Sequence, residues 1–214
     1  QPLTTTTELS NALQGCDLVI EAAPERIDLK LALMTDIDRL APASAIVATN
    51  TSALSITEMA GVMKRPSRVA GMHFFNPVHK MKLIEIVRAL ESSADTLETI
   101  EAVSRRMGKE TVLVRESPGF ITTRVNATIG NEAFFMLMEG VASARDIDKA
   151  LKLGLNHPMG PFELVDLVGL DTRLSILEYL HRSLGDKYRP CPLLAEYVRE
   201  GRLGKKVGRG VYEY

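Results

Sequence analysis

Short apolar runs alternate with amphipathic segments along the first half of the chain. Runs at 18–22, 45–49 and 68–73 are rich in Val, Ile and Ala, as is typical of strands buried on both faces of a sheet. Segments 26–40 and 55–63 lie between them and carry apolar residues at helical spacing, which predicts helices. Strands that alternate with helices through short connections predict βαβ units and a parallel sheet.

The apolar runs on either side of Pro77 predict two strands that fold back on each other. The second run covers 83–87, and a helix over 95–107 and a strand over 111–114 are expected after it. A short amphipathic helix is also expected near the start, over 7–15.

No strand-like alternation occurs from 118 to about 199. The apolar spacing there predicts helices over 118–139, 144–153, 160–184 and 192–199. Ser117 is expected to cap the first helix with Pro118 at its first position, and Ser143 to cap the second. These helices carry more apolar residues than a single layer of packed helices can bury. The excess predicts an interface with another copy in an oligomer.

The chain of 214 residues is long enough for an α/β domain over 1–116 and an all-helical domain over 117–214. Its 45% hydrophobic and 25% charged residues are typical of soluble globular proteins. The net charge of −1 gives no field to attract nucleic acid or a membrane surface, and no apolar run reaches the length of a membrane span. The two cysteines, Cys16 and Cys191, have no CxxC spacing, which predicts a reducing, cytoplasmic location without disulfides or zinc.

A histidine and a carboxylate mark the two strands around Pro77. His73 ends the first apolar run and Glu85 lies within the second. If the strands pair, Glu85 can hydrogen-bond one imidazole nitrogen, which fixes the tautomer and raises the basicity of the other nitrogen. This arrangement suits a general base that takes a proton from a hydroxyl group. The alternative is a structural histidine that lies in an apolar core with its hydrogen bonds satisfied inside the protein.

Small and polar residues follow several of the predicted strands. Ala22, Asn50, Ser52 and His73 all fall at the carboxyl ends of strands, where open α/β sheets bind their ligands. In the helical half, 156–161 predicts a rigid turn between helices. The glycine-rich basic segment 204–212 lacks the strand–loop–helix context of a phosphate loop, but it could bring lysines to an anionic ligand.

Several of these segments resemble the L-3-hydroxyacyl-CoA dehydrogenase family, and in particular its bacterial 3-hydroxybutyryl-CoA dehydrogenases. The motifs that carry the resemblance run in consistent order: Asn50–Ser52, His73–Pro77 with Glu85, Ser117–Phe120 with Arg124, His157–Pro161 and Lys205–Tyr212. The resemblance implies a Rossmann-type domain, a helical dimerisation domain and a homodimer. It also implies NAD-linked oxidation of a 3-hydroxyacyl-CoA to the 3-ketoacyl-CoA, or the reverse reduction.

The resemblance assigns roles residue by residue. His73 matches the catalytic base, Glu85 the carboxylate that orients it, and Ser52 a serine that contacts the substrate oxygen and the nicotinamide end of the cofactor. The residues that match positions lining the cofactor and the reacting centre are Ala22, Glu25, Lys30, Asn50, Asn76 and, near the nicotinamide ribose, Lys206. Glu25 and Lys30 could equally form an ordinary solvated pair at the start of a helix.

Two departures from the family pattern stand out. Thr123 occupies the position of an asparagine, and its hydroxyl offers one donor to a substrate oxygen from a shorter side chain. The G-x-G-x-x-G turn that holds the pyrophosphate, and the acidic residue that binds the adenosine ribose, are not found. We therefore expect a fragment of a longer protein that lacks the first βαβ units and some coenzyme A contacts, and that binds NAD poorly.

Two other functions remain open from the sequence. One is an NAD-dependent dehydrogenase that acts on a free 3-hydroxy acid with the same His/Glu pair. The other is a non-catalytic dimerising fragment.

Overall fold

The computed structural model describes residues 3–214 and divides into two compact units, Gln1–Phe120 and Ile121–Tyr214. Each unit has its own hydrophobic core and is described by itself. Within the described residues, no helix combines the length and the apolar character needed to cross a membrane.

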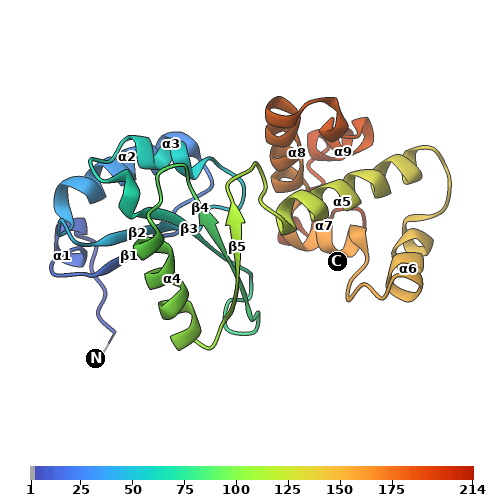
Figure 1. Cartoon of the computed structure of the whole chain (residues 1–214). Helices are drawn as coiled ribbons and strands as arrows, with labels where there is room; N and C mark the ends of the chain where they lie inside the picture. The colour runs from blue at the N-terminus through green and yellow to red at the C-terminus, as the bar shows by residue number, and fades with distance from the viewer. Residues whose placement is uncertain (1–2) are drawn as a thin grey trace. The chain divides into compact units, whose positions relative to one another are not determined.

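The first unit contains a mixed, mostly parallel sheet of five strands in the order β1-β2-β3-β4-β5 (Figure 1). The strands are β1 (Leu18–Glu21), β2 (Ile46–Thr49), β3 (Val69–Phe74), β4 (Leu83–Arg88) and β5 (Glu110–Arg115). The first three are parallel, β4 is antiparallel to β3, and β5 is parallel to β4. The predicted strands and the fold-back around Pro77 are therefore confirmed.

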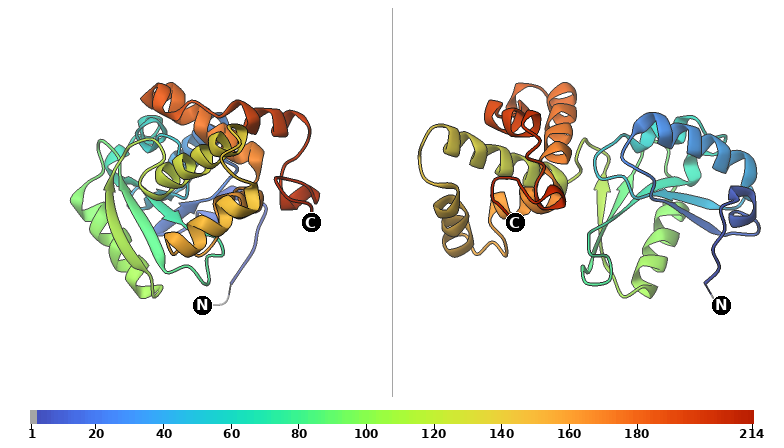
Figure 2. Two further views of the ribbon diagram at one scale, coloured as in Figure 1. Left: turned by 90° about the vertical axis from the view of Figure 1, so that its right-hand side faces the viewer. Right: turned by 180° about the vertical axis from the view of Figure 1, so that it is seen from behind.

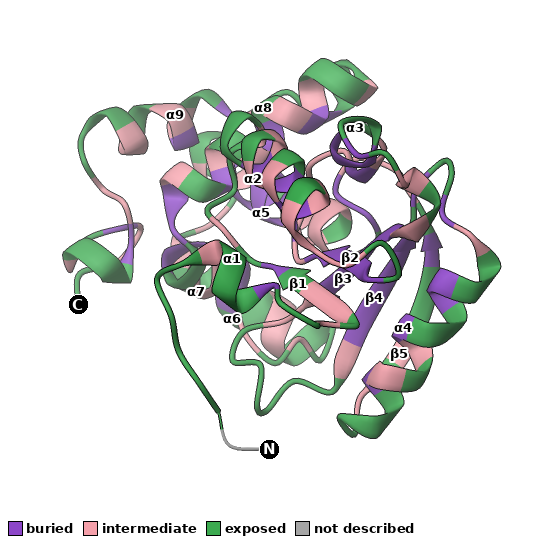
Figure 3. Ribbon diagram, turned by 90° about the vertical axis from the view of Figure 1, so that its left-hand side faces the viewer, coloured by how far each residue is buried: buried purple, intermediate pink, exposed green. Residues whose placement is uncertain are grey.

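Helices cover both faces of this sheet. They are α1 (Leu9–Ala12), α2 (Ile27–Leu40), α3 (Ile56–Gly61) and α4 (Ala94–Arg106), with a 3₁₀ turn η1 (Pro66–Arg68) before β3. Figures 1 and 2 show α2 and α3 on one face and α4 on the other. Side chains alternate along the strands, so Val69 packs in the core under α2 and α3, whereas Met72 packs in the core under α4. Figure 3 shows β3 and β4 as almost entirely buried.

The second unit is all-helical, as predicted. Its helices are α5 (Thr122–Met138), α6 (Ala144–Gly154), α7 (Pro161–Val168), α8 (Leu170–Leu184) and α9 (Pro192–Arg199), with 3₁₀ turns η2 (Asp186–Tyr188) and η3 (Lys205–Val207). The core includes Phe134 of α5, Phe162 of α7 and Leu177 of α8, all fully buried. Ser143 caps α6 by accepting a hydrogen bond from the backbone N–H of Asp146, which confirms the predicted cap.

Two helix predictions were wrong. The helix expected from residue 118 begins at Thr122, because Gly119 and Phe120 have φ of 73° and 50°, in the left-handed region. Ser117 and Pro118 therefore precede the helix and do not cap it. The single helix expected over 160–184 is two helices, because Gly169, with φ of 105°, breaks it.

Two buried aspartates explain the glycine-rich segments of the second unit. Asp166 accepts hydrogen bonds from the N–H groups of Val211 and Tyr212, and a Cβ at Gly210 would overlap the Asp166 carboxylate. Asp148 accepts from Phe162 N–H in the same way. Burial raises the pKa of Asp148, even though several groups donate to it. Gly210 therefore allows the C-terminal segment to pack closely against the Asp166 carboxylate.

Candidate active site

His73 and Glu85 face each other across β3 and β4. The two residues are direct cross-strand partners, and Nδ1 of His73 lies 2.7 Å from Oε2 of Glu85. Both are buried, with 4% and 0% of their surface exposed. The alternation of β3 places His73 on the same face as Gly71, where α3 packs. The pair expected from the sequence is therefore present, and its tautomer is set by the carboxylate.

Two aromatic rings enclose the imidazole. The ring centroid of Phe75 lies 4.6 Å and that of Phe120 lies 5.7 Å from that of His73. Phe120 is itself buried and follows Gly119 in the left-handed turn. In the sequence, Phe120 stands out only as part of the Ser117–Phe120 motif, and its contact with His73 is seen only in the structure. No described residue hydrogen-bonds Nε2 of His73, so this nitrogen is the one that can exchange a proton with a ligand.

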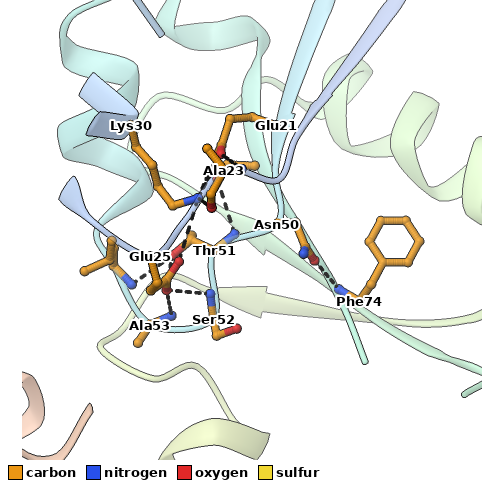
Figure 4. A network of polar contacts seen from close by, with 11 residues as sticks. Glu21, Ala23, Glu25, Lys30, Asn50, Thr51, Ser52, Ala53 and Phe74 are labelled. Carbon is orange, nitrogen blue, oxygen red and sulfur yellow. Dashed lines mark hydrogen bonds and ion pairs between the residues drawn. The ribbon is translucent and has the colours of Figure 1, made fainter. Parts of the chain in front are cut away.

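The loop that follows β1 is built around a buried lysine (Figure 4). The Lys30 ammonium, from α2, donates to both carboxylate oxygens of Glu21, at 2.8 and 3.0 Å, and to the carbonyl oxygen of Ala23, at 2.9 Å. Only 1% of the Lys30 surface is exposed. Lys30 was expected to line the cofactor, but its three N–H donors already bind acceptors inside the protein.

Glu25 organises the loop that carries Ser52 (Figure 4). Its Oε1 accepts hydrogen bonds from the Thr51 hydroxyl at 2.6 Å and from the N–H groups of Ser52 and Ala53 at 2.8 and 3.1 Å. Lys30 lies 3.7 Å from the other oxygen of Glu25. The Glu25 and Lys30 pair is therefore part of a connected network that sets the shape of the loop after β2.

Asn50 links the end of β2 to the end of β3. Its Oδ1 accepts a hydrogen bond from the N–H of Phe74, the residue after His73, at 2.8 Å. No described residue accepts from the Asn50 amide nitrogen or pairs with the Ser52 hydroxyl. These two groups, with the exposed Ala22 at the end of β1, form a set of uncharged donors beside a small side chain. Asn76 is exposed in the turn after β3.

This donor set fits the nicotinamide end of NAD. A carboxamide and a ribose present uncharged carbonyl, amide and hydroxyl groups, which amide and hydroxyl side chains can bind without a charge imbalance. The edge beyond the carboxyl ends of parallel strands is also where dinucleotides bind in such sheets. No G-x-G-x-x-G segment for the pyrophosphate occurs in the described residues, so this donor set matches only the nicotinamide end of NAD.

The remaining candidates belong to the second unit. Thr123 lies in the first turn of α5 and is partly buried. The Lys206 ammonium lies 2.6 Å from both carboxylate oxygens of Asp171, so it is held by an ion pair. Burial raises the pKa of Asp171, but the hydrogen bond and charge of Lys206 and the backbone hydrogen bonds to the carboxylate together outweigh burial and leave the pKa below its ordinary value.

A Rossmann-type sheet with a buried imidazole–carboxylate pair near the carboxyl end of β3 is typical of nucleotide-dependent dehydrogenases. Sequence models of two domains match the chain: "3-hydroxyacyl-CoA dehydrogenase, NAD binding domain" over residues 1–117 and "3-hydroxyacyl-CoA dehydrogenase, C-terminal domain" over residues 119–214. The chain belongs to the 3-hydroxyacyl-CoA dehydrogenase family. The resemblance, the fold class, the enzyme class and the use of NAD are thereby confirmed.

Individual relatives agree with this assignment. A probable 3-hydroxybutyryl-CoA dehydrogenase of Bacillus subtilis is 52% identical over 94% of this chain and 70% of its own length. The crystal structure of (S)-3-hydroxybutyryl-CoA dehydrogenase PaaH1 from Ralstonia eutropha is 47% identical, with a TM-score of 0.92 over 96% of this chain and 73% of that one. The structure of FadB2 from M. tuberculosis is 39% identical, with a TM-score of 0.94 over 98% of this chain and 74% of that one.

Proposed function

We propose that this protein interconverts a short 3-hydroxyacyl-CoA, such as 3-hydroxybutyryl-CoA, and the corresponding 3-ketoacyl-CoA with NAD. The observation that carries the proposal is the His73–Glu85 pair, buried between two aromatic rings with Nε2 free of partners among the described residues. The names of the bacterial relatives support the short acyl chain.

In the oxidative direction, Nε2 of His73 accepts the proton of the 3-hydroxyl group. A bound NAD would supply the acceptor for the hydride that leaves C3, the carbon that carries this hydroxyl group. Glu85 stabilises the imidazolium that forms, because its carboxylate lies against Nδ1. In the reductive direction, the imidazolium returns the proton to the alkoxide. The Ser52 hydroxyl and the Thr123 hydroxyl would hydrogen-bond substrate oxygens on which charge develops.

The cofactor contacts divide into two kinds. Ala22, Asn50, Ser52, Asn76 and Lys206 are proposed to line the cofactor directly. Glu25 and Lys30 are proposed to act through the loop: the buried ammonium fixes Glu21 and Glu25, and Glu25 fixes the amides of Ser52 and Ala53. This division assigns Lys30 to positioning, because all its donors are already used.

A substrate comparison tests the proposal. The assays use the full-length polypeptide that contains this chain, because the 214 residues hold no G-x-G-x-x-G turn for the pyrophosphate. We expect NADH oxidation to be much faster with 3-ketobutyryl-CoA than with free 3-ketobutyrate. In the reverse direction, we expect little NAD reduction with a free 3-hydroxy acid. Equal or higher rates with the free acids would contradict the proposal and favour a dehydrogenase of free 3-hydroxy acids.

NADH fluorescence titration of the 214-residue chain alone tests the expectation that this chain binds the cofactor weakly. Micromolar affinity for NADH would refute that expectation.

We also propose a cytoplasmic homodimer formed through the helical unit. Exposed apolar side chains at the start of α5 support this interface: Ile121, at the N-cap, is 50% exposed and Val125, in the first turn, is 54% exposed. Light scattering should give twice the monomer mass, and Val125→Asp should lower it. A monomer at micromolar concentration would contradict the dimer. The two free cysteines fit a reducing compartment.

A further inference from the structure

Glu116, the residue that follows β5, holds the start of α3. Its carboxylate accepts hydrogen bonds from the Ser55 hydroxyl at 2.8 Å and from the N–H of Thr57 at 3.1 Å. The Thr57 hydroxyl donates to the same carboxylate and accepts from the N–H of Leu90, after β4. A carboxylate at a helix N-terminus binds N–H groups that the helix itself leaves unsatisfied. The end of β5 is therefore anchored to α3 by one side chain.

A tight turn leads from this anchor to Phe120. The N–H of Phe120 donates to the carbonyl oxygen of Ser117 at 2.9 Å, which closes the turn. Gly119 and Phe120 have φ of 73° and 50°. This left-handed conformation is unfavourable for phenylalanine, because its Cβ crowds the backbone. The Phe120 ring is nevertheless buried against His73, and strained residues of this kind gather at functional sites.

Phe120 restricts the tilt of the His73 imidazole. The hydrogen bond between Nδ1 and Glu85 fixes one atom of the ring, which could still rock about that bond. The rings of Phe75 and Phe120, with centroids 4.6 and 5.7 Å from that of the imidazole, limit this motion. Phe75 follows β3 directly, so β3 itself places it. The position of Phe120 depends instead on the turn that starts at Glu116.

We propose that Glu116 is a positioning residue, which anchors the turn over Ser117–Phe120 so that the Phe120 ring keeps the His73 imidazole aligned for proton transfer. The proposal rests on the proposed function for the reaction that His73 performs. All of these residues belong to the first unit, Gln1–Phe120. Loss of the anchor should slow the chemical step and leave substrate binding unchanged, because reaction rates fall steeply when a catalytic group is misplaced.

A double-mutant cycle in the full-length polypeptide tests this path. Glu116→Gln leaves one oxygen acceptor in place of two, and Phe120→Leu removes the ring. Each should lower kcat for 3-ketobutyryl-CoA reduction about tenfold, with KM changed by less than about twofold. Because Glu116 acts through Phe120, the double variant should lose no more than about twofold beyond Phe120→Leu alone. Losses that multiply, or a wild-type kcat in either single variant, would overturn the proposal.

Two controls separate positioning from stability. Ser93→Ala removes the N-cap of α4, where Ser93 accepts from the N–H of Thr96, so it should lower the melting temperature and leave kcat unchanged. Glu110→Gln alters an exposed carboxylate at the opposite end of β5 and should change neither quantity. A loss of kcat in Ser93→Ala as large as that in Glu116→Gln would assign the effect to stability and overturn the proposal.

The NMR signal of the His73 Hε1 proton gives a readout that does not depend on activity. The ring current of Phe120 contributes to its chemical shift, so Phe120→Leu should move the signal and Glu116→Gln should move it in the same direction. An unmoved signal in Glu116→Gln would overturn the proposal. Failure of the proposed function would look different: the wild-type enzyme would not reduce 3-ketobutyryl-CoA, while the His73 signal would still move in both variants.

Discussion

His73 and Glu85 form a hydrogen bond of 2.7 Å between directly opposed residues of antiparallel strands. The antiparallel register that pairs Gly71 with Val87 also pairs His73 with Glu85. Both pairs lie on the same face of the sheet, because side chains two residues apart point to the same side. A slip of one residue would turn the carboxylate to the other face. The core packing that fixes the register therefore also fixes the contact between His73 and Glu85, the proposed catalytic pair.

Replacing the carboxylate tests this relationship. Glu85→Gln keeps the shape of the side chain but removes the charge that stabilises the imidazolium. We expect kcat to fall by at least about tenfold, with little change in KM for the acyl-CoA. Circular dichroism should show the fold unchanged. A kcat equal to that of wild type would show that Glu85 has only a structural role.

Lys30 should contribute to stability far more than Arg26, the exposed cation at the N-cap of the same helix. Lys30→Met leaves Glu21 buried without its partner, and breaking a buried pair in this way costs about 3–5 kcal/mol. Arg26→Met is the matched control, because its ion pair with Asp28 is exposed at 68% and 65% and, like most surface ion pairs, should contribute little to stability. Urea unfolding measures both. Equal effects of the two variants would count against the buried network.

Gly71 is required for the approach of α3 to β3. A Cβ at this position would lie 2.5 Å from Cδ1 of Ile56 and 2.8 Å from Cβ of Val87. Gly71→Ala should therefore destabilise the first unit by about 1–3 kcal/mol through overpacking. Gly61→Ala, where nothing lies within 4 Å, should have no such cost. A melting temperature of Gly71→Ala equal to that of wild type would contradict the close packing of α3 against Gly71.

Asp171 should link stability to pH through its contact with Lys206. Its pKa in the folded state is below the ordinary value, so its contribution is present above about pH 4 and is lost as the pH falls through the folded pKa. The melting temperature of wild type should exceed that of Asp171→Asn near neutral pH, and the difference should shrink below pH 4. A melting-temperature difference between wild type and Asp171→Asn that grows on acidification would contradict the lowered pKa of Asp171.

Hydrophobic periodicity predicted most of the elements and the pairing of the strands around Pro77. It did not predict the break at Gly169, because an isolated glycine in a helical pattern does not reveal its φ. The burial of Lys30 had a signal in the sequence. Lys30 shares a stripe of α2 with the buried residues Met34 and Ile37, at helical spacing, so a cation on that stripe requires a buried partner.

The hydrogen bond from Arg173 of α8 to Asn126 of α5 had no such signal. The two residues lie 47 positions apart, and neither neighbouring sequence marks them as partners. Contacts of this kind depend on how two helices pack, which periodicity alone does not fix. The same holds for the ring of Phe120 beside His73, because the left-handed turn that places it contradicts the helix predicted there.

Turnover of a His73 variant tests the central claim most directly. His73→Gln and, as control, His79→Gln in the exposed turn after β3 are compared for reduction of 3-ketobutyryl-CoA by NADH in the full-length polypeptide. We predict that His73→Gln lowers kcat by about 100- to 10,000-fold while His79→Gln leaves it unchanged. A kcat for His73→Gln that matches wild type would contradict the account.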